Sequence, residues 1–252
     1  MDNLKNYVSD TEWATRCQLA ALYRLIAHYR MTDLIDTHIS CRLPDEPEHF
    51  LINHYGVAFD HMRASDLVKI NHEGKIVETY EQHKRVNVAG FVIHSAIHHA
   101  RPEINCVIHT HTADGMAVSA QEEGLLPLNQ HALKFYGRLA YHEYEGIALS
   151  LEERERLVKD LGHHRAMILR NHGLLAIGES IPRAFHEIYF LERACQAQVK
   201  TLAGGRPLHF PSEQVCEHTA RQFDRDGIDR IIDDAWRAAC SLIRDQEQDY
   251  QS

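Results

Sequence analysis

The sequence lacks the features that mark membrane, secreted or nucleic-acid-binding proteins. Its 252 residues carry a formal net charge of −9 and no block of basic residues, which argues against a nucleic-acid surface. The longest apolar runs are too short to span a bilayer, and the first residues lack the basic-then-apolar pattern of a secretory signal. We therefore expect a cytoplasmic protein that has neither a nucleic acid nor a membrane as its partner.

Closely spaced cysteines are also missing. The six cysteines are scattered without a CxxC pair, so we expect them to be reduced core residues. Hydrophobic residues make up 44% of the chain, which is enough for a sizeable core. Histidine, in contrast, is abundant, with 20 residues. Because most histidines in proteins are surface or hydrogen-bonded residues, only their spacing can identify candidate ligands.

Hydrophobic periodicity predicts alternating helices and strands. Apolar residues at helical spacing predict a helix that begins after Ser9, and a β-branched run predicts a strand at 104–111. The apolar runs on either side of Glu73-Gly74 predict a hairpin, whereas the pattern at 125–137 is typical of a loop. Further helices are expected at about 89–101, 112–124, 150–162, 180–205 and 225–247.

This alternation of helices and strands predicts a layered α/β fold. The hairpin-like strands indicate a sheet that is not purely parallel. Gly204-Gly205-Arg206-Pro207 is the only plausible linker, and it lies too near the end of the chain to separate two domains. We therefore expect residues 1–252 to form a single domain with a C-terminal helical extension at about 206–252.

Two histidines one residue apart end the strand expected at 104–111. Side chains alternate along a strand, so His109 and His111 share a face on which two imidazoles can converge on one ion. This HxH pattern alone is a weak signal, because two strand histidines can also hydrogen-bond to their neighbours. His172, followed by Gly173, lies at a break between two apolar strands. The three histidines together match the open three-ligand pattern of catalytic metal sites.

The segments around these histidines resemble the class II aldolase/adducin family. The resemblance runs through RPEINCVIHTHTADGMAVSA, EGLLPL…YGRLAYHEYEGI and LRNHGLLAIG, and it covers roughly residues 15–205. It implies a three-layer α/β/α fold with a central mixed, largely antiparallel sheet, and a homotetramer. It also implies a divalent metal bound by His109, His111 and His172. Zinc is the first expectation for this metal, and manganese or iron would suit the same ligands.

The sequence departs from the sugar-phosphate aldolases of the family at their substrate site. Their catalytic glutamate aligns with Gly90, and the second residue of their phosphate-binding Gly-Asn pair aligns with His38. Their Ser/Thr-rich loop becomes Asn53 to Gly56. His38, Asn53 and Gly56 are therefore the candidate substrate-binding residues, although His38 could instead fix a turn in its loop. The segments DTHIS, FLIN, AGF and LLPL are closer to the adducin-like bacterial branch of the family.

His131 is the candidate catalytic residue. It falls near the position at which family aldolases present a tyrosine to the neighbouring subunit's site, where a histidine could give or take a proton. The alternative is a loop histidine that faces solvent. His94 and His98 stand at helical i and i+4 spacing, and we expect them to be packed, hydrogen-bonded helix residues rather than a chelating pair.

The resemblance and the three histidines favour a metal-dependent lyase that acts on a small hydroxy- or keto-acid. A divalent ion held by neutral imidazoles has open positions and stabilises the enolate that forms when a carbon–carbon bond breaks. Aldol cleavage and decarboxylation both fit, and Gly90 favours decarboxylation because that step needs no base to remove a proton. The alternative is a non-catalytic, adducin-like module for binding or self-association. A non-haem iron oxygenase on the same fold is a third, weaker possibility.

Overall fold

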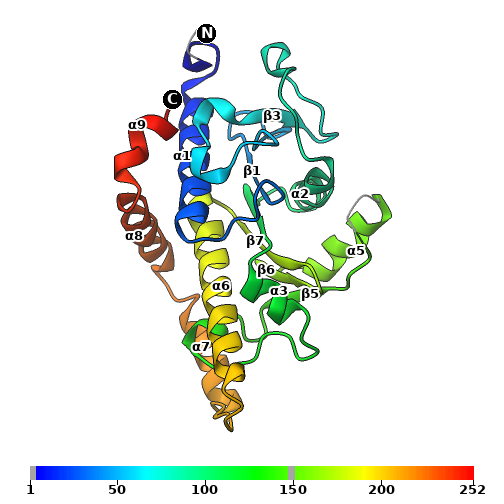
Figure 1. The fold of residues 1–252 in the computed structure, drawn as a ribbon, viewed down its shortest axis with the longest axis vertical. Helices are drawn as coiled ribbons and strands as arrows, with labels where there is room; N and C mark the ends of the chain where they lie inside the picture. The colour runs from blue at the N-terminus through cyan, green and yellow to red at the C-terminus, as the bar shows by residue number, and fades with distance from the viewer. Residues whose placement is uncertain (1–3, 147–150) are drawn as a thin grey trace.

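A seven-stranded sheet forms the centre of the molecule (Figure 1). The computed structural model describes residues 4–146 and 151–252. The order across the sheet is β3-β2-β1-β4-β7-β6-β5, and all neighbouring strands are antiparallel except β5 and β6. The strands are β1 (His38–Arg42), β2 (His49–Ile52), β3 (Val68–Asn71), β4 (Cys106–Thr110), β5 (Leu139–His142), β6 (Ala166–Leu169) and β7 (Gly173–Gly178).

Helices cover both faces of this sheet. On one side lie α1 and α6 and on the other α2 and α5, so the three-layer α/β/α prediction with a mixed, largely antiparallel sheet is confirmed (Figure 1). The α-helices of the described residues are α1 (Asp10–His28), α2 (Val88–Ala100), α3 (Ala113–Ser119), α4 (Gln130–Leu133), α5 (Leu151–Leu161), α6 (Ile181–Ala203), α7 (Glu213–Gln222), α8 (Ile228–Ser241) and α9 (Glu247–Tyr250). Single 3₁₀ turns lie at Leu4–Asn6, Phe59–His61, Ala64–Asp66, Thr79–Glu81 and Arg244–Gln246.

The core lies on both sides of the sheet because successive strand residues point to opposite faces. On β4, Ile108 packs into the cluster that contains α1 and α6, whereas Val107 packs with residues of α2 and α5. Every residue of β4 and β7 is buried. This two-sided burial explains why both strands are apolar without alternation, apart from His109 and Thr110 at the end of β4.

The helix predicted after Ser9 is confirmed as α1. The Ser9 hydroxyl accepts a hydrogen bond from the Glu12 main-chain N–H at 3.1 Å, which caps the helix. The Glu12 carboxylate contacts Arg16 at 2.8 Å and Lys69 at 3.1 Å. Arg16 is fully buried and also contacts Glu81 at 3.2 Å. These buried ion pairs join α1 to β3 and to the 3₁₀ turn that follows it.

The predicted hairpin around Glu73-Gly74 is only partly formed. Its first strand is β3, and Gly74 makes the turn at a φ of +77°. The returning segment makes a single bridge, Ile70 with Ile76, instead of a strand. The Lys69 N–H donates to the Glu81 carboxylate at 2.8 Å, so a side chain satisfies a donor that a second strand would otherwise pair.

Two further segments differ from the sequence prediction. The loop expected at 125–137 contains the short helix α4, because the Asn129 side chain accepts from the N–H groups of His131 and Ala132. The helix expected at 225–247 is confirmed in α8, but α7 precedes it without having been predicted. Helix α7 buries only two side chains, Cys216 and Ala220, so its apolar pattern is weak.

The residues that follow α6 pack back onto earlier helices. Trp236 of α8 contacts Phe185 of α6, with ring centroids 5.6 Å apart. Asp249 of α9 accepts from Arg24 of α1 at 2.5 Å. No helix in the described part of the chain is long and apolar enough to cross a membrane.

Candidate metal centre

Two neighbouring strands bring three histidines together. His109 is on β4, His111 follows that strand directly, and His172 lies in the turn between β6 and β7. Because β4 pairs with β7, this turn lies beside the end of β4. Asn171 adopts a φ of +55° in the turn, and a Cβ at Gly173 would stand 2.4 Å from the Thr110 oxygen. The local sequence therefore requires a tight turn and a residue without a side chain.

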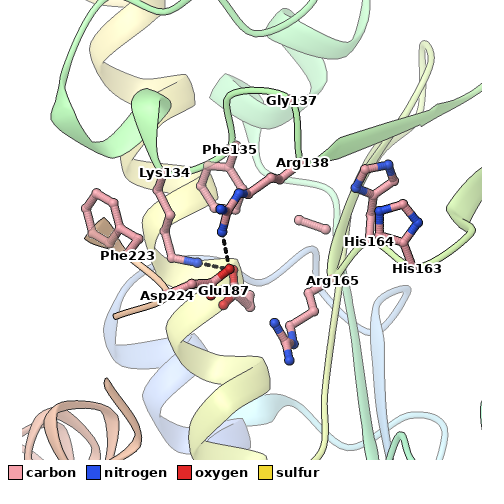
Figure 2. Close-up of a pocket in the computed structure, with 11 residues that line it drawn as sticks. Lys134, Phe135, Gly137, Arg138, His163, His164, Arg165, Glu187, Phe223 and Asp224 are labelled. Carbon is pink, nitrogen blue, oxygen red and sulfur yellow. Dashed lines mark hydrogen bonds and ion pairs between the residues drawn. The ribbon is translucent and has the colours of Figure 1, made fainter. Parts of the chain in front are cut away.

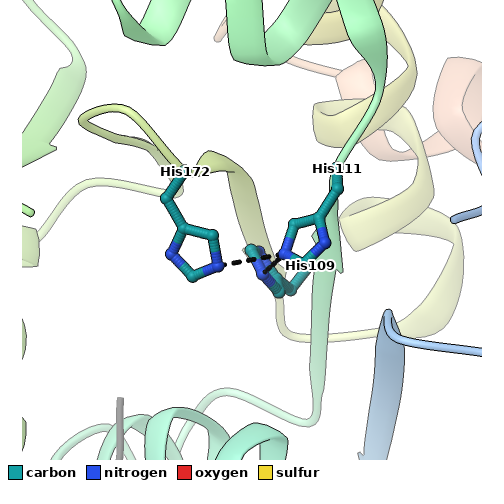
Figure 3. A group of neighbouring side chains, drawn as sticks. All are labelled: His109, His111 and His172. Carbon is teal, nitrogen blue, oxygen red and sulfur yellow. Dashed lines mark hydrogen bonds between the residues drawn. The ribbon is translucent and has the colours of Figure 1, made fainter. Parts of the chain in front are cut away.

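The three imidazoles point toward one another (Figure 3). His109 Nε2 lies 2.7 Å from His111 Nε2, and His111 Nε2 lies 3.0 Å from His172 Nε2. The three candidate ligand atoms all lie within 4.8 Å of one another. The predicted convergence of His109, His111 and His172 is thus present in the fold.

The outer ring nitrogens determine which form two of these imidazoles take. His109 Nδ1 lies 2.9 Å from the Leu174 oxygen, which can only accept, so Nδ1 carries the proton. His111 Nδ1 lies 3.0 Å from Asp33 Oδ2, which favours the same form. In neutral rings both Nε2 atoms then present lone pairs to each other. A cation between them relieves this repulsion, and outer partners of this kind are usual for metal-bound histidines.

The donor set fits a divalent transition metal. Two nitrogens that share one tetrahedral zinc ion at 2.0–2.1 Å stand about 3.3 Å apart. The separations of 2.7 and 3.0 Å found here would therefore have to widen by only a few tenths of an ångström. Burial and the neighbouring histidines lower the pKa of His109 well below its usual value. The same causes lower the pKa of His172 to about 4. Both rings are therefore neutral near pH 7, which is the ligating form.

His38 lies in a strand and not in the predicted loop. It is the first residue of β1 and the register partner of His109 on β4. Its ring centroid lies 5.2 Å from that of His109, and burial lowers its pKa to about 3. A Cβ on Gly90 would stand 2.1 Å from His38 Cδ2, so the ring fills the space that a side chain at position 90 would need. The idea that His38 fixes a loop turn is therefore wrong.

Asn53 and Gly56 follow β2. Asn53 is buried, and its Oδ1 accepts from the Tyr23 hydroxyl at 2.9 Å. The Tyr23 oxygen in turn accepts from the Asn53 and Ile39 N–H groups at 3.1 and 3.0 Å. The Asn53 side chain thus has a structural partner in α1. Gly56 makes the turn that follows, at a φ of +105°.

His131 lies apart from the three histidines, on the short helix α4. Its ring packs against Phe190 of α6, with centroids 4.9 Å apart. Among the described residues, its buried Nδ1 has no hydrogen-bond partner. Burial and Arg193 lower its pKa. His131 is therefore a half-buried helix residue with an unused polar atom, and the prediction of a loop position is wrong.

Two residues of this region, Asp33 and Ser40, were not singled out from the sequence. Asp33, which binds His111, precedes β1 and follows α1, so 78 residues separate the two partners. His94 and His98 were expected to be hydrogen-bonded helix residues, and this is confirmed. Their common partner Ser40 carries no sequence signal, because a single serine in a strand is unremarkable without its register.

A separate hollow of about 370 Å³ lies between α4, α6 and the start of β6 (Figure 2). Its cationic side chains are already matched by carboxylates. Lys134 pairs with Glu187 and Arg138 with Asp224. The hollow therefore offers no unmatched charge to a ligand, and we assign it no function.

Comparison with known proteins identifies the family. The model of the class II aldolase and adducin N-terminal domain matches residues 17–199, and the chain belongs to this family. An aldolase II superfamily protein from Pseudomonas syringae has a crystal structure that superposes with a TM-score of 0.94, at 48% identity over 99% of both chains. The L-fuculose 1-phosphate aldolase from Glaciozyma antarctica PI12 superposes with a TM-score of 0.84, at 28% identity over 100% of this chain and 96% of that one.

Adducins belong to the same set of relatives. Alpha-adducin from Rattus norvegicus is 47% identical over 189 residues, which is 75% of this chain but only 26% of that protein. The family thus contains proteins named as aldolases and proteins named as adducins. Membership supports a metal-dependent, aldolase-type lyase at the level of the family, and the activity of this chain has to be argued from its site.

Proposed function

We propose that this protein is a divalent-metal-dependent carbon–carbon lyase acting on a small hydroxy- or keto-acid. The observation that carries the proposal is the convergence of three imidazole Nε2 atoms, two of them 2.7 Å apart with their protons held on the opposite nitrogen. A scaffold without a bound ion would have no use for this arrangement, because it places lone pairs against each other. Zinc is the metal we expect first.

In this proposal the chain's own residues divide the work. His109, His111 and His172 would hold the ion, and Asp33 and the Leu174 oxygen orient the first two rings. When bound, the ion supplies positive charge that stabilises the negative charge left on a substrate oxygen as a carbon–carbon bond breaks. His38 borders the same centre. The turn from Asn53 to Gly56 is the proposed second substrate contact.

Position 90 favours decarboxylation over aldol cleavage. Aldol cleavage begins when a base removes a hydroxyl proton, and Gly90 offers no side chain for that task. Loss of carbon dioxide leaves its electron pair without a prior proton transfer, so it suits a site that lacks a carboxylate there. The buried Glu81 does not replace it, because its oxygens are bound by Arg16 and by the Lys69 N–H.

Elemental analysis of the purified protein tests this proposal first. We expect about one divalent metal per chain in the wild type and its loss in His109→Ala/His111→Ala. His131→Ala is the matched control, because it removes an imidazole outside the cluster. Metal-loaded protein should then cleave or decarboxylate members of a panel of small hydroxy- and keto-acids. Metal-free protein after incubation with zinc and manganese would contradict the proposal, as would turnover of sugar phosphates alone.

His131 is proposed as an acid–base residue that serves the site of a neighbouring subunit in a homotetramer. The ring is only half-buried in its own chain, which supports access to a neighbouring subunit. A mixing experiment tests this role, once sedimentation has established the assembly. His131→Ala and His109→Ala/His111→Ala should each be inactive alone and should regain activity in mixed oligomers. Failure of mixed oligomers to regain activity would contradict a shared site.

The second candidate function is a non-catalytic, adducin-like binding or self-association module. The 47% identity to rat alpha-adducin favours it. It predicts self-association that is unchanged in His109→Ala/His111→Ala and no turnover of any acid. The six cysteines of the chain are unpaired, which supports a reducing, cytoplasmic location under either function.

A further inference from the structure

A line of hydrogen bonds runs from the edge of the metal centre into the interface between β1 and α2. His38 Nδ1 lies 2.8 Å from His94 Nε2. His94 Nδ1 lies 2.7 Å from the Ser40 hydroxyl, which lies 2.8 Å from His98 Nε2. The line ends where His98 Nδ1 lies 3.2 Å from the main-chain oxygen of Ile104. All four side chains are at most 4% exposed.

The last acceptor determines the direction of every bond in this line. The Ile104 oxygen can only accept a hydrogen bond, so His98 carries its proton on Nδ1 and has none on Nε2. The Ser40 hydroxyl must then donate to His98, and its oxygen accepts from the N–H at His94 Nδ1. His94 Nε2 consequently carries no proton, and it accepts a hydrogen bond from the N–H at His38 Nδ1. The proton of His38 is thereby held on Nδ1, which leaves its Nε2 without one.

This assignment requires neutral rings, and their surroundings keep them neutral. Burial lowers the pKa of His94 well below its usual value. Burial, reinforced by Arg42, lowers the pKa of His98 to about 3. Both rings lie on α2 and face β1, which also keeps them away from bulk water. At pH 7 each ring therefore carries a single proton, and the line has only one consistent arrangement.

The His38 ring, which ends this line, lies beside the metal centre. His38 is opposite His109 in the β1–β4 ladder, and the two rings are in contact. Among the hydrogen bonds of the described residues, His38 Nε2 has no partner. Gly90 allows the ring to occupy this position, because any side chain there would overlap Cδ2 and Nε2. The lone pair of Nε2 is thus a fixed acceptor on a ring that borders the site.

We propose that Ser40, His94 and His98 are positioning residues that hold His38 as a hydrogen-bond acceptor for a hydroxyl group of the substrate. A fixed lone pair attracts O–H and repels a keto or carboxylate oxygen, since neither of these carries a proton. Leaving such a pair unmatched would also cost binding energy. The inference rests on the proposed lyase function and adds a hydroxyl group to its substrate class. The substrate is a hydroxy-acid for aldol cleavage, or a keto-acid that also carries a hydroxyl for decarboxylation, because loss of carbon dioxide needs a carbonyl to receive the electron pair.

Nitrogen NMR of the metal-free protein tests the positioning directly. Two-bond nitrogen–proton correlations of the imidazoles distinguish a protonated Nδ1 from a protonated Nε2, and His38→Asn and His94→Asn assign the signals. We expect His38 and His94 to carry the proton on Nδ1 in the wild type. A wild-type His38 with its proton on Nε2 would overturn the proposal, whether or not any variant folds.

Two variants of Ser40 isolate the hydroxyl. Ser40→Thr and Ser40→Val have the same shape and suit a strand, but only threonine keeps the hydroxyl. In Ser40→Val, an N–H at His94 Nδ1 would face a methyl group, so we expect this ring to move its proton to Nε2. His94 would then donate to His38 Nδ1, so the proton of His38 must move to Nε2, which becomes a donor. Ser40→Thr should keep the wild-type arrangement. The same tautomers in both variants would overturn the proposed coupling from Ser40 through His94 to His38.

Ligand binding tests the consequence for the substrate. With the zinc-loaded protein, calorimetry compares lactate with pyruvate, which differ only in a hydroxyl against a keto oxygen. We expect wild type and Ser40→Thr to bind lactate at least tenfold more tightly, and Ser40→Val to lose or reverse this preference. Equal binding of both acids, or of neither, would overturn the selection of a hydroxyl. Failure to bind zinc would instead overturn the proposed function. The tautomers measured by NMR would still test the coupling from Ser40 to His38.

Discussion

His38 and His109 face each other across the β1–β4 ladder, with ring centroids 5.2 Å apart. Gly90 lies against the His38 ring, so close that a Cβ at position 90 would overlap it. One residue of α2 thus sets whether an imidazole can stand beside the candidate metal ligands.

Gly90→Ala should therefore destabilise the wild-type protein by about 1–3 kcal/mol, because the added methyl group overlaps the His38 ring. In a His38→Ala background the overlap is gone, and the same change should stabilise α2 by up to about 1 kcal/mol. Urea unfolding of the four proteins measures both effects. Equal effects of Gly90→Ala in the two backgrounds would show that the two residues do not interact.

Zinc should raise the thermal midpoint of the wild-type protein, because an ion that binds only the folded state adds to stability. At free zinc a hundredfold above its Kd, the gain is about 2.7 kcal/mol. His172→Ala should lose most of this gain, since its Nε2 is one of the three convergent atoms. Scans with zinc and with EDTA measure the gain, and His131→Ala should respond like the wild type. A zinc response that survives in His172→Ala would argue against this ligand set.

The free energy of unfolding should fall as the pH drops below about 6.5, and His98 should account for part of the fall. Its pKa is about 3 in the folded protein and about 6.5 in the unfolded chain. The unfolded chain therefore binds more protons in this window, and the stability present above pH 6.5 is lost on acidification.

Between pH 7.5 and 5, the wild type should lose about 2 kcal/mol more than His98→Asn, a variant with no titrating ring at this position. Urea unfolding in EDTA at several pH values measures this difference without a contribution from bound metal. His218→Asn, at an exposed position, should keep the wild-type pH dependence. Parallel curves for the wild type and His98→Asn would mean that His98 takes up its proton over the same pH range in the folded and in the unfolded chain.

Arg16→Met should destabilise the protein by about 3 kcal/mol, because it leaves the buried carboxylates of Glu12 and Glu81 with fewer partners. Arg237→Met removes an arginine from an exposed pair with Asp234 and should cost less than about 1 kcal/mol. Denaturant unfolding of the two variants gives the comparison. If both substitutions had the same small effect, the ion pairs of Arg16 would not be important for stability.

The sequence predicted the layers of this fold because burial leaves a regular pattern. Strand β7 and the first three residues of β4 are continuous apolar runs, and α1 and α6 begin at serine caps. The hairpin after β3 could not be predicted in detail, because Glu81 satisfies a strand N–H from outside the local pattern. Helix α7 was missed since only two of its side chains are buried.

The candidate ligands could be found from the sequence because two of them are close in the chain and the third stands at a strand break. Their orienting groups could not be found in this way. Asp33 lies 78 positions from His111, and Ser40 lies more than 50 from His94 and His98. Such partners meet only through strand register and helix placement, which depend on the whole sheet.

The pairing of His38 with His109 gives the β1–β4 register a meaning beyond strand geometry. A slip of one residue would turn His38 and Ser40 to the opposite face. It would leave the buried His94 ring without partners and the His98 ring with the Ile104 oxygen alone. Buried polar atoms without partners are costly, so the slipped form would be penalised during folding. The residues that orient His38 in this site thereby also favour the correct strand register when the sheet assembles.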